Sequence, residues 1–126
     1  MSGFFLGRYF WQVKLVSPND PILIDRTGMY TLGVTDPNTL HVYLSDGLPQ
    51  ELRIRVMLHE IAHCCMFSFG LVDDIHRMVY PNMWIEAEEW VCNFIADYGV
   101  TIFVSAYHTL GEEVWSYIAQ KLEVIF

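Results

Sequence analysis

The most informative segment of the chain is His59-Glu60-Ile61-Ala62-His63. It lies within a longer stretch, residues 49–69, in which apolar residues recur at the spacing of a helix. Asp46-Gly47-Leu48-Pro49 suits the start of that helix, with Pro49 in the first turn, and Gly70 suits its end. We therefore expect one long helix here. Because most of its residues are apolar, we expect much of it to be buried.

This segment has the spacing of a metal site. Residues four apart share one face of a helix, so the imidazoles of His59 and His63 can point to the same ion. Glu60 lies at the edge of that face, where it can act as general base toward a water that the ion activates. Two imidazoles and a carboxylate in an apolar helix need partners, and a metal ion supplies them. A random order of this composition contains the motif only about 0.01 times, so we predict a Zn²⁺ site.

A catalytic zinc ion usually takes a third protein ligand and keeps one position open for water. The next helix is expected over residues 84–98, ending at Gly99, and its first part offers three carboxylates, Glu86, Glu88 and Glu89. We favour Glu89, because it shares a face with Asn93 and with small and apolar neighbours that indicate an inward orientation. Glu86 is the rival, whereas Glu88 falls about 100° away and is expected to be solvated. Further candidates are Asp73, Asp74 and His76.

Several other residues can be interpreted either as functional or as structural. The amide oxygen of Asn93 could accept the second ring N–H of a metal-bound histidine, or Asn93 could simply bond to backbone. His76 and Tyr80 lie in an expected loop over residues 71–83, where either could donate to a developing oxyanion or be an ordinary surface residue. Cys92 could be a thiolate ligand or nucleophile, or a small buried hydrophobe. His41 and His108 are isolated, and we interpret them as structural.

The rest of the pattern predicts an α+β fold, with strands first and helices after. Strands are expected over residues 11–16, 22–25, 29–35 and 40–45, and the last two form a hairpin around Asp36-Pro37-Asn38-Thr39. Residues 100–107 suit either a helix or a buried strand. A third amphipathic helix is expected from Gly111 to Leu122.

Composition restricts the class of protein. A chain of 126 residues suits a single domain over residues 1–126, and a hydrophobic fraction of 53% argues against disorder. The net charge of -8 gives phosphates little to bind, so nucleic acid is not an expected partner. No uncharged run reaches the roughly 18–20 residues of a membrane span, and the N-terminus lacks the features of a signal peptide. Of three cysteines, Cys64 and Cys65 are adjacent, so we expect no disulfide framework and favour the cytoplasm.

Three stretches together resemble a zincin with glutamate as third ligand (gluzincin-like), and in particular the ImmA/IrrE-like metallopeptidases, many of them encoded by phages and mobile elements. The stretches are the hairpin over residues 30–45, the His59–His63 motif, and Glu89-x-x-x-Asn93-x-x-Ala96, so the resemblance covers about residues 27–98. The family often has Glu two residues before the Asn and Ala directly before it, where this chain has Val91 and Cys92. The Phe usually found two residues after the Asn is displaced to Phe94.

The resemblance implies a small zincin-like fold, in which a twisted antiparallel sheet packs on the motif helix beside two further helices. It also implies that Leu40–Ser45 is the edge strand that aligns the substrate as an added strand. The expected function is a zinc-dependent metallopeptidase that hydrolyses a peptide bond in a protein substrate, such as a repressor encoded beside it. No membrane or direct nucleic-acid partner is expected.

Two other functions stay open. The first is a non-catalytic phage or mobile-element accessory protein with a structural zinc ion, and the second is a zinc hydrolase with a non-peptide substrate. The intact Glu60 favours the peptidase, because a structural site needs no base beside an open coordination position.

Overall fold

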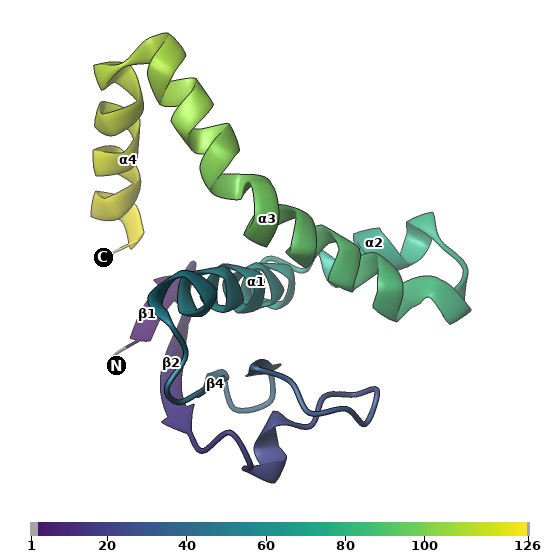
Figure 1. Ribbon diagram of the computed structural model, residues 1–126. Helices are drawn as coiled ribbons and strands as arrows, with labels where there is room; N and C mark the ends of the chain where they lie inside the picture. Colours follow the sequence, from purple (N-terminus) through teal and green to yellow (C-terminus); the bar gives the residue numbers. More distant parts are fainter. Residues whose placement is uncertain (1–2, 126) are drawn as a thin grey trace.

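Four strands in the N-terminal third of the chain form one sheet (Figure 1). The computed structural model describes residues 3–125, with side chains up to residue 121. The strands are β1 (Gly3–Leu6), β2 (Tyr9–Val16), β3 (Gly33–Asp36) and β4 (His41–Ser45), in the order β1-β2-β4-β3. The hairpins β1–β2 and β3–β4 are antiparallel, but β2 and β4 run parallel. The chain is therefore α+β as predicted, with a mixed sheet where an antiparallel one was expected.

The position of β4 corrects the prediction that Leu40–Ser45 is an edge strand. Two chain reversals separate β4 from β2, so the β3–β4 hairpin places β4 beside β2 in the same direction. Val42 and Leu44 on β4 are both 0% exposed, which fits a central strand. The two edges of the sheet are β1 and β3.

Helix α1 (Gln50–Ser68) lies across one face of the sheet (Figure 1) and confirms the long helix predicted around the motif. Trp11, Val42 and Cys64 form the fully buried centre of this interface. The indole Nε1 of Trp11 donates a hydrogen bond of 2.7 Å to Oγ of Ser68, which satisfies the polar atom of the largest core side chain.

The segment between the two long helices is more ordered than the sequence suggested. Where a loop was expected, the chain forms α2 (Val72–Met78) and a 3₁₀ turn, Pro81–Met83. A second core cluster, Ala62, Met66 and Cys92, joins α1 to helix α3 (Trp84–Leu110) and receives Val72 and Ile75 from α2. The apolar residues of this short helix were present in the sequence, but seven residues are too few to show a clear period.

Helix α3 extends far beyond its predicted end at Gly99. It runs without interruption over Trp84–Leu110 and ends at Gly111, whose φ of 61° lies in the left-handed region. Residues 100–107, ambiguous in the sequence, are helical. A glycine inside a helix costs only about 0.5–1 kcal/mol relative to alanine, which is too little to stop a helix that otherwise continues.

Helix α4 (Glu112–Ile125) returns beside the distal part of α3, and the two helices project away from the sheet (Figure 1). Three helices therefore accompany α1, where two were expected. Among the described residues no single helix is long and apolar enough to cross a membrane. Only α1 and α2 taken together have that length and composition, and they are bent by 93° at their junction.

The first part of the chain, up to residue 25, differs from the prediction in three respects. β1 was not predicted, and β2 begins at Tyr9, two residues before its predicted start. Residues 22–25 are not a strand: Pro21–Leu23 forms a 3₁₀ turn, and the Asp20 side chain accepts a hydrogen bond from the amide of Ile22. Local capping by Asp20 and the fixed φ of Pro21 decide this segment, despite its β-branched composition.

Candidate metal centre

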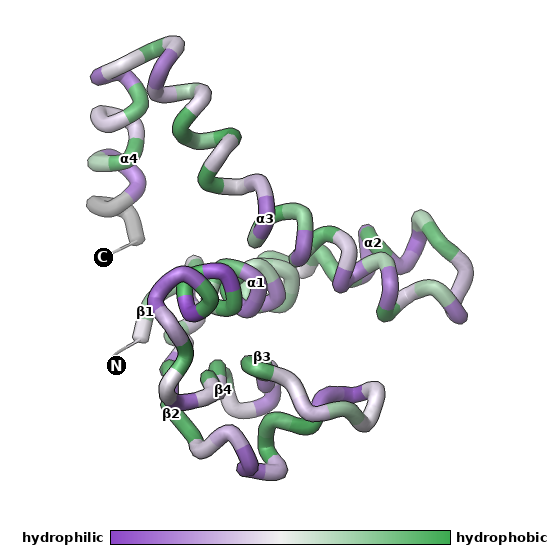
Figure 2. Tube along the Cα trace, viewed as in Figure 1, coloured by the Kyte–Doolittle hydropathy of each residue, from purple (hydrophilic) through white to green (hydrophobic). Residues whose placement is uncertain are grey.

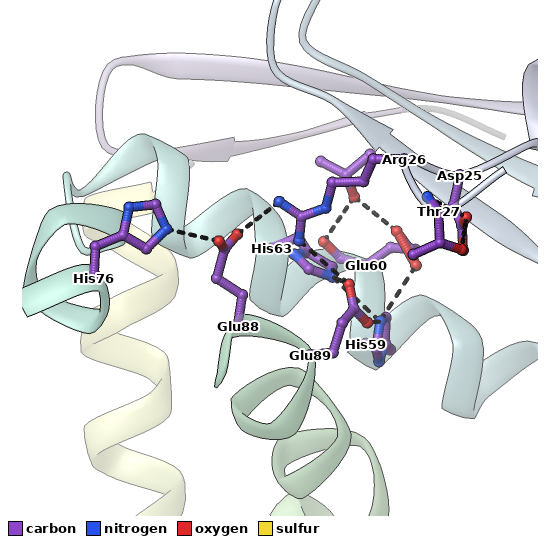
Figure 3. A network of polar contacts seen from close by, with 10 residues as sticks. Asp25, Arg26, Thr27, His59, Glu60, His63, His76, Glu88 and Glu89 are labelled. Atoms are coloured by element: carbon purple, nitrogen blue, oxygen red, sulfur yellow. Dashed lines mark hydrogen bonds and ion pairs between the residues drawn. The ribbon is translucent and has the colours of Figure 1, made fainter. Parts of the chain in front are cut away.

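Three side chains from two helices converge at the junction of α1 and α3 (Figure 3). One ligand atom each of His59, His63 and Glu89 can be chosen so that all lie within 4.8 Å of one another, and the group could hold a metal ion. Oε2 of Glu89 lies 3.0 Å from Nε2 of His59, and Oε1 lies 3.1 Å from Nε2 of His63. The structure thus places the favoured third residue, Glu89, beside both histidines, while Glu86 is exposed on the same helix.

The spacing of these atoms suits zinc. The two Nε2 atoms are 3.2 Å apart. Ligands at about 2.0–2.1 Å in a tetrahedron are separated by about 3.3 Å, so the observed separations need little adjustment. Two imidazoles and one carboxylate are also a donor set that Zn²⁺ takes in catalytic sites. The residues present therefore fit the ion.

Glu60 lies directly beside this group. Its side chain is almost fully buried, and Oε2 lies 3.9 Å from Nε2 of His59. The other oxygen, Oε1, accepts a hydrogen bond of 2.9 Å from Oγ1 of Thr35 on β3. Burial raises the pKa of Glu60, and the neighbouring histidines only partly offset this effect. We call His59, His63 and Glu89 the ligand group. A carboxylate with one oxygen anchored and the other facing the ligand group is placed to exchange a proton there.

Close approach of β3 to α1 depends on Gly33. A Cβ on this residue would lie 2.8 Å from Cγ1 of Val56 and 3.0 Å from Cγ of Glu60. The absence of a side chain lets the strand come near enough for Thr35 to reach Glu60. Gly33 and Thr35 were not predicted as site residues, because nothing local in a strand marks which side chain meets a helix residue distant in sequence.

A second acidic residue of α3 corrects the sequence interpretation. Glu88, expected to be solvated, is 2% exposed. Oε1 lies 3.1 Å from Nη1 of Arg26, and Oε2 lies 2.8 Å from Nε2 of His76 (Figure 3). Helix periodicity placed Glu88 away from the Glu89 face, but α2 and the loop after the first 3₁₀ turn cover that side.

Arg26 connects this buried carboxylate to the ligand group. Its Nη2 lies 3.5 Å from Oε1 of Glu89, while Nη1 contacts Glu88. The guanidinium thus spans both acids of α3 (Figure 3). The sequence contained only a general signal for this residue: a buried Glu requires a cation, and the chain has 7 Lys and Arg in total.

His76 and Tyr80, predicted as candidate oxyanion donors, are not brought to the ligand group. His76 is held at Glu88, and its ring stacks on Trp84 with centroids 4.2 Å apart. Tyr80 is 82% exposed. Asp73 and Asp74 also lie outside the group of potential ligands within the described residues.

Asn93 lines the same cavity as the ligand group. In the described part of the chain, Nδ1 of His59 is buried without a hydrogen-bond partner. Asn93 is nevertheless one of the groups that raise the pKa of the His59 imidazole, so its amide lies close to that ring. A bond from the ring N–H of a metal-bound His59 to the Asn93 amide stays a prediction.

Cys92 lies in the core between α1 and α3, and it is fully buried. Burial raises the pKa of its thiol far above the ordinary value, so the group stays protonated. This favours the interpretation of Cys92 as a small core residue over a ligand or nucleophile.

A cavity of about 610 Å³ opens onto the group, bounded by β3, α1, α3 and residues 24–27. Arg26, Thr35 and Asn93 line it together with the three potential ligands and Glu60. Its volume is in the range of sites that bind small molecules or peptide side chains.

Hydrogen bonds with both histidines set the charge state of the group. They hold the pKa of Glu89 well below its ordinary value, against the effect of burial. Burial works against a charged His59, but Glu89, Glu60 and Asn93 together outweigh it and raise the pKa of that imidazole.

Comparison of the chain with family models, with curated proteins and with solved structures finds no significant match. The resemblance to ImmA/IrrE-like metallopeptidases therefore rests on the motif residues alone.

Proposed function

We propose that the chain is a zinc-dependent metallopeptidase of zincin-like, ImmA/IrrE-like type, which hydrolyses a peptide bond in a protein substrate. One observation carries the proposal: His59, His63 and Glu89 converge with a separate buried carboxylate, Glu60, beside them. A structural zinc site is normally closed by four protein ligands. The described residues bring together three, which favours an open catalytic site.

His59, His63 and Glu89 would hold the ion. When bound, zinc supplies a Lewis acid and lowers the pKa of a water ligand to about 7. Arg26 would keep Glu89 oriented, because it contacts Oε1 of that residue from its anchor on Glu88.

Glu60 is the proposed general base. Its Oε2 accepts a proton as a water oxygen attacks the carbonyl carbon of the substrate, while Thr35 holds Oε1. The same carboxyl then donates that proton to the leaving nitrogen as the C–N bond breaks. The raised pKa of Glu60 suits both steps, because a group whose pKa is closer to the working pH can both accept and donate a proton.

The open edge of β3 is the proposed position of the substrate backbone. β3 has β4 on one side only, and Gly33, Val34 and Thr35 line the cavity. An extended peptide could add to this edge as a further strand. A protein substrate, such as a regulatory protein or repressor, would supply that segment from a loop or terminus.

The proposal is tested by metal content and by cleavage of a peptide library derived from a proteome, with new N-termini read by mass spectrometry. Purified protein should contain about one zinc ion per chain. Glu60→Gln should keep the ion but lose cleavage, whereas the exposed control Glu86→Gln should keep both. Unchanged cleavage in Glu60→Gln would remove Glu60 from the mechanism, and zinc-free protein of ordinary stability would overturn the proposal.

The alternative, an accessory or interaction protein with a structural zinc ion, predicts a different result. The wild-type chain would then contain zinc and cleave nothing. Removal of zinc would unfold it, because a structural ion contributes directly to folding.

A further inference from the structure

The distal half of α3 and helix α4 form a hairpin with an apolar groove along one face. The groove has a volume of about 810 Å³. We call it the hairpin groove, and its lining includes Ile102, Phe103, Leu110, Val114 and Tyr117 together with Glu113 and Lys121. Figure 2 shows the hydrophobic segments along this part of α3 and α4, beyond the region where α3 packs on α1.

The hairpin groove exposes more apolar surface than the hairpin itself can cover. Ile102 is 54% exposed, Leu110 is 55% exposed and Tyr117 is 58% exposed. The segment from Tyr98 to Gly111 contains no Lys, Arg, Asp or Glu. Contiguous apolar surface of this kind marks a site of association.

The charges in the hairpin groove have a symmetric placement. Glu113, Tyr117 and Lys121 are four residues apart and share one face of α4, with the two charges about 12 Å apart along the axis. Lys121 is the only Lys or Arg after Arg77 in the sequence. Its Nζ lies 5.4 Å from the centre of the Tyr117 ring. Among the side chains that the structure describes, neither Glu113 nor Lys121 forms an ion pair.

We propose that the hairpin groove binds the hairpin of a second copy of the chain. Two copies related by a two-fold axis at Tyr117 would run their α4 helices antiparallel, so that Glu113 of each copy meets Lys121 of the other. A two-fold interface requires such self-complementarity, and an acid and a base equidistant from a central aromatic residue provide it. The aromatic and aliphatic side chains of the groove would form the core of the interface.

The charges of the hairpin groove suit a lipid surface less well than a second copy of the chain. Helices that bind membranes carry several cations on their polar face and meet anionic headgroups. Here α4 has one Lys in its sequence, Lys121, against three acidic residues, Glu112, Glu113 and Glu123, on a chain with a net charge of -8. The inference does not depend on the proposed peptidase activity.

The test is the mass of the full-length protein in solution, measured by light scattering and sedimentation equilibrium over a range of concentrations. The wild-type chain should be a dimer. Glu113→Lys places Lys against Lys and Lys121→Glu places Glu against Glu at both symmetric contacts, so each should raise the Kd about tenfold or more. The double variant Glu113→Lys/Lys121→Glu restores opposite charges and should recover most of the affinity.

Glu112→Lys is the matched control, since Glu112 is adjacent to Glu113 but does not line the groove. It makes the same change of charge and should leave the Kd within about twofold. Tyr117→Glu should give a monomer that keeps its helical circular dichroism. Zinc content should be the same in all variants, which separates this inference from the proposed function.

Three results would overturn the proposal. The first is a wild-type chain that stays monomeric up to about 1 mM, and the second is a double variant that associates no better than the single variants. The third is a monomer that binds phosphatidylcholine vesicles and loses that binding in Tyr117→Glu, which would assign the hairpin groove to lipid.

Discussion

The guanidinium of Arg26 donates a hydrogen bond of 3.1 Å to the carboxylate of Glu88, a group that is nearly inaccessible to solvent. The pair links the loop before β3 to helix α3, across 62 positions of sequence. His76 holds the second oxygen of the same carboxylate. Because Arg26 also contacts Glu89, the buried acid supports the geometry of a potential metal ligand that it does not touch itself.

Glu88→Gln should therefore weaken zinc binding by about tenfold, in the range seen when groups behind metal ligands are changed. The variant keeps the shape of the side chain but loses the charge that anchors Arg26. Competition with a chromogenic chelator measures the effect. Glu86→Gln, an exposed neighbour on α3, is the control, and equal affinities for the two variants would contradict the supporting role of Glu88.

Glu89→Ala should lower zinc affinity more strongly, by at least about 100-fold, because it removes a ligand and not its support. Glu86→Ala should leave the affinity near that of the wild type. Dialysis against buffered zinc, followed by metal analysis, gives both values. If Glu86→Ala has the larger effect, the third ligand is Glu86. The side chains at the α1–α3 junction must then rearrange when zinc binds.

The position of α1, which carries both histidines, and the inward orientation of Glu89 followed from helical periodicity. His59 and His63 are four residues apart on α1, and an apolar face of α3 indicated that Glu89 points inward. Such information is local, since it depends on which residues share one side of a helix. It therefore identified the three residues that converge.

The remaining parts of the site come from contacts between elements distant in sequence. Arg26 lies in a turn, Gly33 and Thr35 lie on an edge strand, and His76 lies in a short helix that resembled a loop. Strand order has the same origin: β4 is central because Val42 and Leu44 pack under α1, whereas the turn sequence predicts only the hairpin. At Gly99 the local pattern was itself misleading. It predicted the end of a helix, but the helix continues to Leu110.

Gly33→Ala should destabilise the protein by about 1–3 kcal/mol, the usual cost of inserting an atom into a filled contact. The added Cβ would lie 2.8 Å from Val56 and 3.0 Å from Glu60, so β3 must move away from α1. Urea unfolding measures the change in the free energy of unfolding.

Gly99→Ala is the matched control for Gly33→Ala. Its Cβ would meet only Cγ2 of Ile95, at 3.6 Å, and alanine favours the helix by roughly 0.5–1 kcal/mol. The two substitutions should therefore have opposite signs. A loss of stability in both variants would contradict the close approach of β3 to α1 as the specific cause.

Metal-free protein should show a stability contribution from His59 and Glu89 that depends on pH. Burial lowers the pKa of His59, but Glu89, with smaller effects of Glu60 and Asn93, raises it above its ordinary 6.5. This contribution is therefore complete below pH 6.5 and is lost as the pH rises through the folded-state pKa. Glu89 has a pKa below its ordinary 4.5, so its contribution is present above pH 4.5 and is lost as the pH falls. The pair should stabilise the fold most between these two values.

Comparison of the wild type with Glu89→Gln after removal of metal with a chelator isolates this contribution. Glu60 has a raised pKa and so favours the folded state at lower pH, but it is present in both proteins and its effect largely cancels. The difference in the free energy of unfolding should be largest near pH 5–6 and should shrink toward pH 8. A difference that grows steadily up to pH 8 would mean that His59 is neutral throughout, and that Glu89 stabilises the site by hydrogen bonds without an ion pair.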